Sequence, residues 1–200
     1  MQAKTMIDYL KHLNQLMLDT QTTGLTGNAL TLEEGANMSV EMIGKVHANS
    51  GKVMLGGNGG SSAIVSHVQN DLSEAAGVRS MVFTEEPVLT ARANDHGYGS
   101  VFERPIELWA EPGDLLVTVS SSGQSENIIR ALKMAREKKC GLITFSGFKP
   151  DNPSRSLGDI NFYVPSSVYG YVETAHMSLI HYLTGMVTET IKAPSSGDRS

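Results

Sequence analysis

Short apolar runs that alternate with helical stretches constrain the fold of this chain more than any other feature of its sequence. Five such runs follow residue 50, and we expect them to be strands at residues 52–55, 81–84, 115–119, 141–146 and 160–164. Strands that are apolar on both faces are typical of parallel sheets buried between helices. The sequence therefore predicts an α/β fold in three layers, built on a doubly wound, parallel, five-stranded sheet.

Amphipathic helices are expected between these strands, and two more precede the first strand. Apolar residues recur at three- and four-residue steps over residues 6–18 and, more loosely, over residues 30–48. The three later helices are expected at residues 61–76, 125–139 and 171–191. We interpret residues 1–192 as a single domain that includes the N-terminal helical pair (1–50), and residues 193–200 as a disordered tail. The helical pair needs a surface to pack on, and a partner subunit is one candidate.

Composition argues against several classes of protein. The chain has 16 Lys and Arg against 21 Asp and Glu, and this net charge of −5 argues against a nucleic-acid partner. No apolar run approaches the ~18–20 residues of a membrane span, so no membrane partner is expected. The single cysteine, Cys140, excludes an internal disulfide and indicates a reducing, cytoplasmic location.

The first informative loop is rich in glycine and joins a strand to a helix. It reads GGNGGSS over residues 56–62. Glycines let backbone N–H groups approach an anion closely, and the N-terminus of the following helix adds a favourable dipole. A tight turn needs only one or two glycines, so four of them favour an anion site. Its place after a strand also fits the rule that doubly wound sheets bind ligands at the carboxyl ends of their strands.

The second informative loop reads SSSGQS over residues 120–125, again between a strand and a helix. Serine hydroxyls and the amides of a helix N-terminus can surround a phosphomonoester without any fixed positive charge. Capping of the helix by Ser125 is the alternative interpretation. Capping accounts for one serine but not for the three consecutive serines before Gly123.

A dinucleotide site is the alternative interpretation of the first loop. Gly57, Gly59 and Ser62 come close to the glycine fingerprint of such sites, and Glu85 or Glu86 follows the next predicted strand. A dinucleotide does not need the second, serine-rich loop, so we expect no nucleotide cofactor.

The two loops, in this order, resemble the sugar isomerase (SIS) domain, and other motifs resemble the phosphoheptose isomerase (sedoheptulose 7-phosphate isomerase) family. These motifs are GGNGGSS at 56–62, His67 with Asp71 and Leu72, ANDHGYG at 93–99, EPGDLLVTVSSSGQSENI at 111–128 and ETAHMSLIH at 173–181. The resemblance covers almost everything after residue 50. It implies an aldose–ketose isomerase that converts sedoheptulose 7-phosphate to D-glycero-D-manno-heptose 7-phosphate. It also implies a homotetramer with active sites at subunit interfaces.

The same resemblance implies roles for individual residues. Asp71 and His181 stand where the family places its acid/base pair, and in an interfacial site they can come from different chains. Asn58 and Asp95 would contact sugar hydroxyls. The other substrate-binding residues that the resemblance implies, five of them serines that would hold the phosphate, are Gly59, Ser61, Ser120, Ser121, Ser122, Ser125 and Glu173.

Isomerisation through an enediol needs a base near C1 and C2 and an acid for the sugar oxygens. A carboxylate and an imidazole suit this chemistry because both can exchange protons near neutral pH once their environment tunes them. We assign Asp71 as the base and His181 as the acid. The roles can swap with the direction of the reaction.

His67 and Asp71 lie four residues apart on one helix face, which is also a spacing for divalent metal ligands. A hydrogen-bonded pair that stabilises the helix is the alternative. The family includes zinc-containing members, and the resemblance implies a zinc site at His67, Asp71, Glu173 and His181. Glu173 and His181 are eight residues apart, about 12 Å of helical rise, so both reach one ion only if their side chains converge. We interpret His176, three residues after Glu173, either as a support for the residues of the site or as structural.

Three positions depart from the family pattern. The family usually has glutamate where this chain has Asp71, glutamine where it has Glu173, and aspartate where it has Gly170. A shorter carboxylate moves the reacting group, and a misplacement of ~1 Å can lower a rate ~10²-fold. An altered substrate is therefore one interpretation of these changes.

A function of a different class is a non-catalytic SIS-type module that senses sugar phosphates or contacts other proteins. Some relatives regulate replication initiation and lack the acid/base residues. This chain has a carboxylate at residue 71 and an imidazole at residue 181, which favours catalysis.

Overall fold

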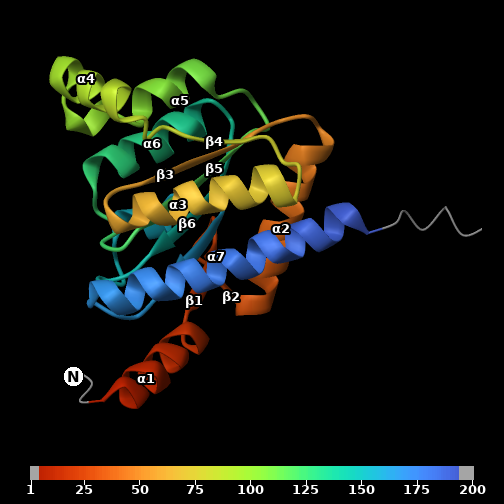
Figure 1. Cartoon of the computed structure of the whole chain (residues 1–200), viewed down its shortest axis with the longest axis vertical. Coiled ribbons are helices and arrows are strands. Elements are labelled where there is room, and N and C mark those ends of the chain that lie inside the picture. Colours follow the sequence, from red (N-terminus) through yellow and green to blue (C-terminus); the bar gives the residue numbers. More distant parts are fainter. Residues whose placement is uncertain (1–4, 194–200) are drawn as a thin grey trace, which may run out of the picture.

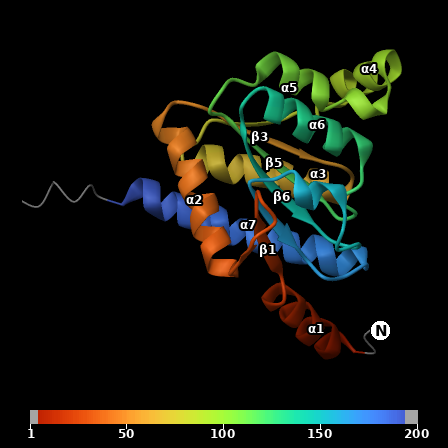
Figure 2. The ribbon, with the colours of Figure 1, turned by 180° about the vertical axis from the view of Figure 1, so that it is seen from behind.

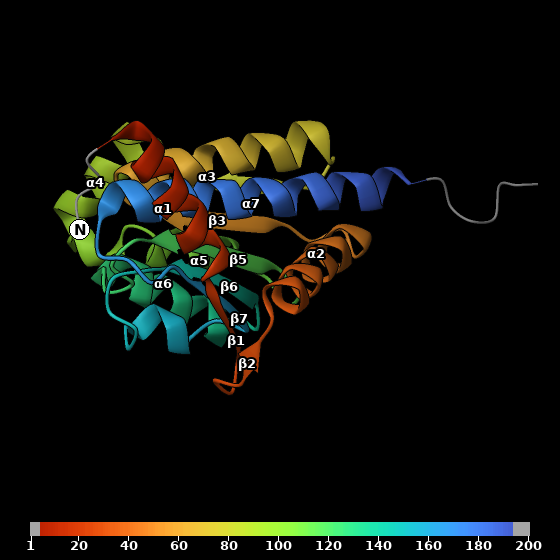
Figure 3. The ribbon, with the colours of Figure 1, turned by 90° about the horizontal axis from the view of Figure 1, so that it is seen from below.

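The computed structural model describes residues 5–193 and shows one sheet of seven strands between two layers of helices (Figures 1 and 3). The predicted three-layer α/β fold is therefore confirmed. The predicted tail lies outside the described residues except for Ala193. No helix in the described part of the chain is both long enough and apolar enough to cross a lipid bilayer.

The helices and strands alternate along most of the chain, with three short helical turns (η1 to η3) between them. Their bounds are α1 Met6–Leu18, β1 Gln21–Gly24, β2 Ala29–Leu30, α2 Leu32–Ala48, β3 Val53–Gly57, α3 Gly60–Asn70, η1 Asp71–Ala75, β4 Ser80–Val82, α4 Glu86–His96, η2 Tyr98–Ser100, α5 Glu103–Trp109, β5 Leu115–Ser120, α6 Glu126–Glu137, β6 Gly141–Ser146, η3 Pro153–Ser156, β7 Ile160–Tyr163 and α7 Tyr169–Lys192.

The sheet runs in the order β2-β1-β7-β6-β5-β3-β4. Strands β3 to β7 are mutually parallel, as predicted, and β1 pairs antiparallel with β7 and with β2. The order of the parallel strands reverses between β3 and β5, which are direct neighbours. This is the place where doubly wound sheets bind their ligands.

The parallel strands other than the edge strand β4 bury both of their faces because their side chains alternate between two cores. Val53 and Leu55 of β3 pack in the core beneath α2, α3 and α7, whereas Met54 packs in the core beneath α5 and α6. All three side chains are fully buried. This arrangement explains why these strands are continuously apolar in the sequence.

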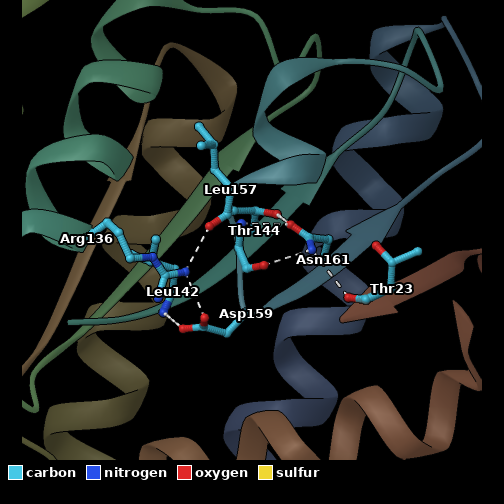
Figure 4. Close-up of polar contacts among 8 residues, drawn as sticks. Thr23, Arg136, Leu142, Thr144, Leu157, Asp159 and Asn161 are labelled. Atoms are coloured by element: carbon cyan, nitrogen blue, oxygen red, sulfur yellow. Dashed lines mark hydrogen bonds and ion pairs between the residues drawn. The ribbon is translucent and has the colours of Figure 1, made fainter. Parts of the chain in front are cut away.

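The β1–β2 hairpin adds two strands that the sequence did not predict. Antiparallel pairing of β1 with β7 joins it to the parallel sheet, and the side-chain amide of Asn161 in β7 also donates to the carbonyl of Thr23 at 3.3 Å (Figure 4). The Asn161 amide oxygen accepts from the Thr144 hydroxyl of β6 at 2.5 Å. One buried side chain thus connects β1, β6 and β7.

Helix α1 stands apart from the sheet, at the opposite end of the molecule from α4 and α5 (Figures 1 and 2). It packs on the start of α7, where the rings of Tyr9 and Tyr171 stack with centroids 4.6 Å apart. Its apolar side chains Met6, Ile7 and Leu10 are 72%, 64% and 54% exposed. This helix therefore has an apolar face that the described part of the chain does not cover.

Candidate active site

A pocket of about 250 Å³ opens at the carboxyl ends of β3 and β5, where the two informative loops meet. We call it the serine–glycine pocket. It is lined by Asn58, Gly59, Gly60, Ser61, Ser120, Ser121, Ser122, Ser125, Tyr169 and Glu173. The structure thus brings together eight of the nine residues proposed from sequence for substrate binding.

The first loop leads into α3, and residues of the loop and of the first turn of α3 line the pocket. Gly59 precedes α3 with φ +55°, a conformation that residues other than glycine rarely adopt. Among residues 5–193, no side chain caps the N-terminus of α3. Helix N-termini without caps are ready-made sites for anions, because their first N–H groups lack partners.

The second loop leaves a buried polar atom without a partner. The hydroxyl of Ser121, a residue only 5% exposed, has no hydrogen-bond partner in the described part of the chain. Ser125 precedes α6, and its hydroxyl makes no capping bond to the described helix. An unpaired buried hydroxyl costs free energy, and a ligand in the pocket can remove that cost by accepting from it.

Side-chain amides tie the two loops to each other. The amides of Asn58 and Asn127 donate to each other's oxygens at 2.9 and 2.8 Å, and the Tyr98 hydroxyl donates to the Asn58 oxygen at 3.0 Å. Asn127 lies in the first turn of α6. Sequence reasoning missed Asn127 and Tyr98, although both lie inside the motifs that it quoted. It also missed Tyr169, for which we find no sequence signal.

A second cluster lies on the seam between α3 and α7, which run side by side over one face of the sheet (Figures 1 and 3). We call His67, Asp71 and His181 the seam cluster. Asp71 Oδ2 lies 3.5 Å from His67 Nε2 and 3.6 Å from His181 Nε2. The two imidazole centroids are 4.9 Å apart. A single chain therefore brings the predicted acid and base together.

Asp71 sits where α3 changes its winding. The α-helix ends at Asn70, and residues Asp71–Ala75 form a π-helical turn, within the helix predicted over residues 61–76. Such turns often mark functional sites because they redirect side chains. Both imidazoles remain partly exposed, so the seam cluster faces outward.

The donor set of the seam cluster fits a divalent metal. Its three donor atoms lie within 4.8 Å of one another. Zinc bonds of about 2.0–2.2 Å place tetrahedral ligand atoms about 3.4 Å apart, close to the two distances from Asp71. Two imidazoles and one carboxylate leave the fourth position open, as in catalytic zinc sites.

Two predicted site residues lie elsewhere. Glu173, the fourth proposed zinc ligand, is outside the seam cluster and lines the serine–glycine pocket, because two turns of α7 separate it from His181. A single chain therefore brings three of the four predicted zinc ligands together, and the four-ligand set stays a prediction. Asp95 lies on α4 outside the pocket lining, where its carboxylate accepts from the Asn94 amide at 2.9 Å.

His176 and Cys140 are the titratable groups that burial perturbs most. Burial lowers the pKa of His176 to about 4, although its Nε2 lies 3.0 Å from the Ser146 carbonyl oxygen. Burial, with Asp114 nearby, raises the pKa of the Cys140 thiol to about 11. Neither group lines the serine–glycine pocket, so the structure gives both a structural role.

Known proteins share both this fold and these motifs. A family model described as SIS domain matches residues 12–147. The phosphoheptose isomerase of Aliarcobacter butzleri is 35% identical over 162 residues, which cover 78% of this chain and 83% of that protein. The phosphoheptose isomerase of Aneurinibacillus thermoaerophilus is 30% identical over 194 residues, which cover 93% and 96%.

A solved structure gives the same result. The phosphoheptose isomerase of Neisseria gonorrhoeae superimposes with a TM-score of 0.73 and 28% identity, over 78% of this chain and 87% of that one. These matches cover most of this chain and most of each relative. This chain belongs to the phosphoheptose isomerase family of SIS-domain proteins.

Proposed function

We propose that this chain is an aldose–ketose isomerase that converts sedoheptulose 7-phosphate to D-glycero-D-manno-heptose 7-phosphate through an enediol. The observation that carries the proposal is the convergence of two strand ends on one pocket, with the buried Ser121 hydroxyl unpaired among the described residues. The lining includes five serines, the start of α3 and the carboxylate of Glu173, and no lysine or arginine of residues 5–193 belongs to it. Neutral donors of this kind hold a phosphomonoester.

The distance from the pocket to the seam cluster suits a seven-carbon sugar phosphate. Seven residues of α3 separate Gly60 in the pocket from His67, which is about 10 Å of helical rise. An extended chain advances about 1.2 Å per bond, so the eight bonds from C1 to phosphorus also span about 10 Å. A phosphate held in the pocket therefore lets C1 reach the seam cluster.

The side chains of the seam cluster can move the protons that the reaction requires. Asp71 removes a proton from C1 of the ketose, and the bonding pair forms the C1–C2 double bond while His181 protonates the C2 oxygen. Loss of the O1 proton and return of a proton to C2 then give the aldose. Asp71 Oδ2 faces both imidazoles, which leaves Oδ1 for the substrate.

We also propose that His67, Asp71 and His181 can hold a zinc ion through the two Nε2 atoms and Asp71 Oδ2, which leaves Asp71 Oδ1 and the His181 Nδ1–H for the proton transfers. When bound, zinc would polarise a sugar oxygen and so favour the enediol. The supporting observation is the spacing of the three donors given above. Calorimetric titration of the wild type and His67→Ala with Zn²⁺ tests this, since the substitution removes one donor and should weaken Zn²⁺ binding at least tenfold.

A homotetramer in the cytoplasm is the assembly and location that we propose. The exposed apolar face of α1 supports an oligomer, since such a face is typical of a subunit contact. The outward-facing seam cluster supports an interfacial site, because a second subunit can cover it and exclude water.

The proposal is tested by exchange of the C1 proton of sedoheptulose 7-phosphate with deuterated water, followed by NMR. Asp71→Asn should lower exchange about 10²- to 10⁴-fold, the usual contribution of a general base, while sugar-phosphate binding changes less than threefold. Glu74→Gln, an exposed carboxylate of the same π-helical turn, is the control and should keep full exchange.

Unchanged exchange in Asp71→Asn would remove Asp71 from its role. Binding of the sugar phosphate to the wild type without any exchange would instead favour the non-catalytic sensing module. Similar affinities of wild type and His67→Ala for Zn²⁺ would contradict the zinc site alone.

A further inference from the structure

The side-chain amide of Asn58, which lines the serine–glycine pocket, is held by two residues that do not line it. Asn58 Nδ2 donates to Asn127 Oδ1 at 2.9 Å, and Asn127 Nδ2 donates back to Asn58 Oδ1 at 2.8 Å. The Tyr98 hydroxyl donates to the same Asn58 oxygen at 3.0 Å. Asn127 is 2% exposed and Tyr98 is 53% exposed, so this network of hydrogen bonds runs from the core to the surface.

The backbone of α6 fixes the orientation of the Asn127 amide. The N–H of Ile128, which also bonds to the Ser125 carbonyl oxygen, donates to Asn127 Oδ1 at 3.0 Å. An Asn127 amide rotated by 180° would place its own N–H groups against this donor, and two donors cannot form a hydrogen bond. Asn127 therefore presents one acceptor and one donor to Asn58 in a fixed order. Asn58 can match them only with its nitrogen against the acceptor and its oxygen against the donor.

This order leaves Asn58 able to donate to a ligand but not to accept from it. An amide oxygen accepts two hydrogen bonds, and Asn58 Oδ1 already accepts from Asn127 and Tyr98. The amide nitrogen has two N–H groups, and only one of them has an acceptor among the described residues. Asn58 therefore meets a ligand in the pocket as a donor, which suits an oxygen of a phosphorylated sugar. A rotated Asn58 amide would offer that oxygen an acceptor instead, and the contact would be lost.

We propose that Asn127 and Tyr98 are positioning residues that fix the Asn58 amide as a hydrogen-bond donor to a phosphorylated sugar. Neither residue needs to touch the ligand, because both act through Asn58. The inference rests on the proposed function, which assigns a phosphorylated sugar to the pocket. It adds which two side chains determine the role of Asn58, and it does not involve the seam cluster.

The test is a double-mutant cycle on the dissociation constant of sedoheptulose 7-phosphate, measured by calorimetry on the full-length protein. Asn58→Ala removes the donor and should weaken binding about tenfold. Tyr98→Phe leaves the Asn58 oxygen one hydrogen bond short and should weaken binding about threefold, and Asn127→Leu should weaken it about tenfold. In the Asn58→Ala background, each of these two substitutions should change the constant by less than about twofold, because the residue through which they act is gone.

The cycle separates positioning from a structural role, because general disruption of the pocket would weaken binding equally in both backgrounds. Tyr182→Phe is the matched control, since it removes the hydroxyl of a tyrosine on α7 that is 49% exposed, and it should change no constant. NMR of the ¹⁵N-labelled protein gives a second readout. The side-chain amide signal that disappears in Asn58→Ala should shift when sedoheptulose 7-phosphate is added to the wild type, and shift less in Tyr98→Phe.

The outcomes distinguish this inference from the proposed function. Equal losses of affinity in the two backgrounds, or unchanged affinity in both Tyr98→Phe and Asn127→Leu, would overturn the inference and leave the isomerase intact. Tyr98 is exposed, so Tyr98→Phe keeps the test decisive if the buried Asn127→Leu substitution prevents folding. If the wild type binds no sedoheptulose 7-phosphate, the proposed function fails and the inference is overturned with it.

Discussion

The two ends of the central strands, β3 and β5, differ in whether their buried polar groups have hydrogen-bond partners. At the amino end, the carboxylate of Asp114 is 2% exposed and accepts from the backbone N–H groups of Lys52 and Glu111 at 2.9 and 2.8 Å. The Lys52 ammonium lies 2.6 Å from it. At the carboxyl end, the Ser121 hydroxyl is almost as buried and has no partner among the described residues.

The pattern at the amino end repeats at the neighbouring pair of strands. Asp159 precedes β7, and its carboxylate accepts from the backbone N–H of Leu142 and from Arg136, at 2.8 and 2.7 Å (Figure 4). At the amino end of each of these two strand pairs, one aspartate thus accepts the hydrogen bonds of nearby backbone N–H groups or cations. The amino end is completed by the chain itself, whereas the carboxyl end keeps unused hydrogen-bonding capacity for a ligand. Of the described residues with an unpaired buried side-chain atom, only Ser121 lines the pocket, so unused capacity and a hollow together locate the candidate site.

The largest effect on stability is expected from removing the buried carboxylate at the amino end of β3 and β5. Asp114→Ala leaves Lys52, whose side chain is 12% exposed, without its closest ion-pair partner, and it leaves two backbone N–H groups unpaired. Removing one partner of a buried pair typically costs about 3–5 kcal/mol of unfolding free energy. Urea denaturation should show a loss in this range, with the affinity of the folded protein for sugar phosphate unchanged within about twofold.

A matched control is Glu111→Gln, because Glu111 also contacts Lys52, at 3.3 Å, but its side chain is 78% exposed. Exposed pairs contribute about 0–1 kcal/mol, so its effect should be small. If the two variants destabilised the protein equally, burial would not distinguish the two carboxylates.

The next effect is a dependence of stability on pH that comes from His176. This histidine lies beneath the carboxyl end of β6, and its Nε2 contacts the Ser146 carbonyl oxygen. Burial lowers its pKa from 6.5 to about 4. The unfolded chain therefore binds a proton below about pH 6.5 that the folded chain refuses, so stability is lost as the pH falls toward 4. The loss at pH 4 amounts to roughly 3 kcal/mol.

The measurement is the free energy of unfolding between pH 7 and pH 4 for the wild type and His176→Gln. The variant should lose most of the slope in this window. His96→Gln, a substitution of an exposed histidine on α4, should leave the slope unchanged. Coincident slopes for the wild type and His176→Gln would show that this histidine is not the source of acid sensitivity.

Sequence patterns predicted the elements whose burial is visible in the local order of apolar and polar residues. Strands β3, β5, β6 and β7 were predicted because each is a continuous apolar run, and both pocket loops because each joins such a strand to a helix. The β1–β2 hairpin was missed because its strands are short and polar. Helix α4 was missed because it has no buried residue, so no apolar periodicity marks it.

The candidate site divides in the same way. The spacing of His67 and Asp71 placed them on one helix face because both belong to one segment. The position of His181 beside them, and of Glu173 away from them, depends on how α7 is aligned along α3. That alignment is set by packing between helices about a hundred residues apart in the chain, and no local pattern in the sequence contains it.

The smallest effect on stability is expected at the carboxyl end of the strands. It tests the contrast between the two strand ends most sharply, because it separates ligand binding from stability. Ser121→Ala removes a hydroxyl that is unpaired among residues 5–193, so the free energy of unfolding should change by less than about 0.5 kcal/mol. Affinity for sedoheptulose 7-phosphate should fall about tenfold, because a hydrogen bond to a charged group is lost. Ser154→Ala is the matched control, since its hydroxyl is also buried and unpaired in the described chain but lies in η3, outside the pocket. Denaturation and calorimetry on both variants should show the same stability response but a loss of affinity only in Ser121→Ala. Equal losses of affinity would mean that the effect of Ser121→Ala does not come from a contact between its hydroxyl and a ligand in the pocket.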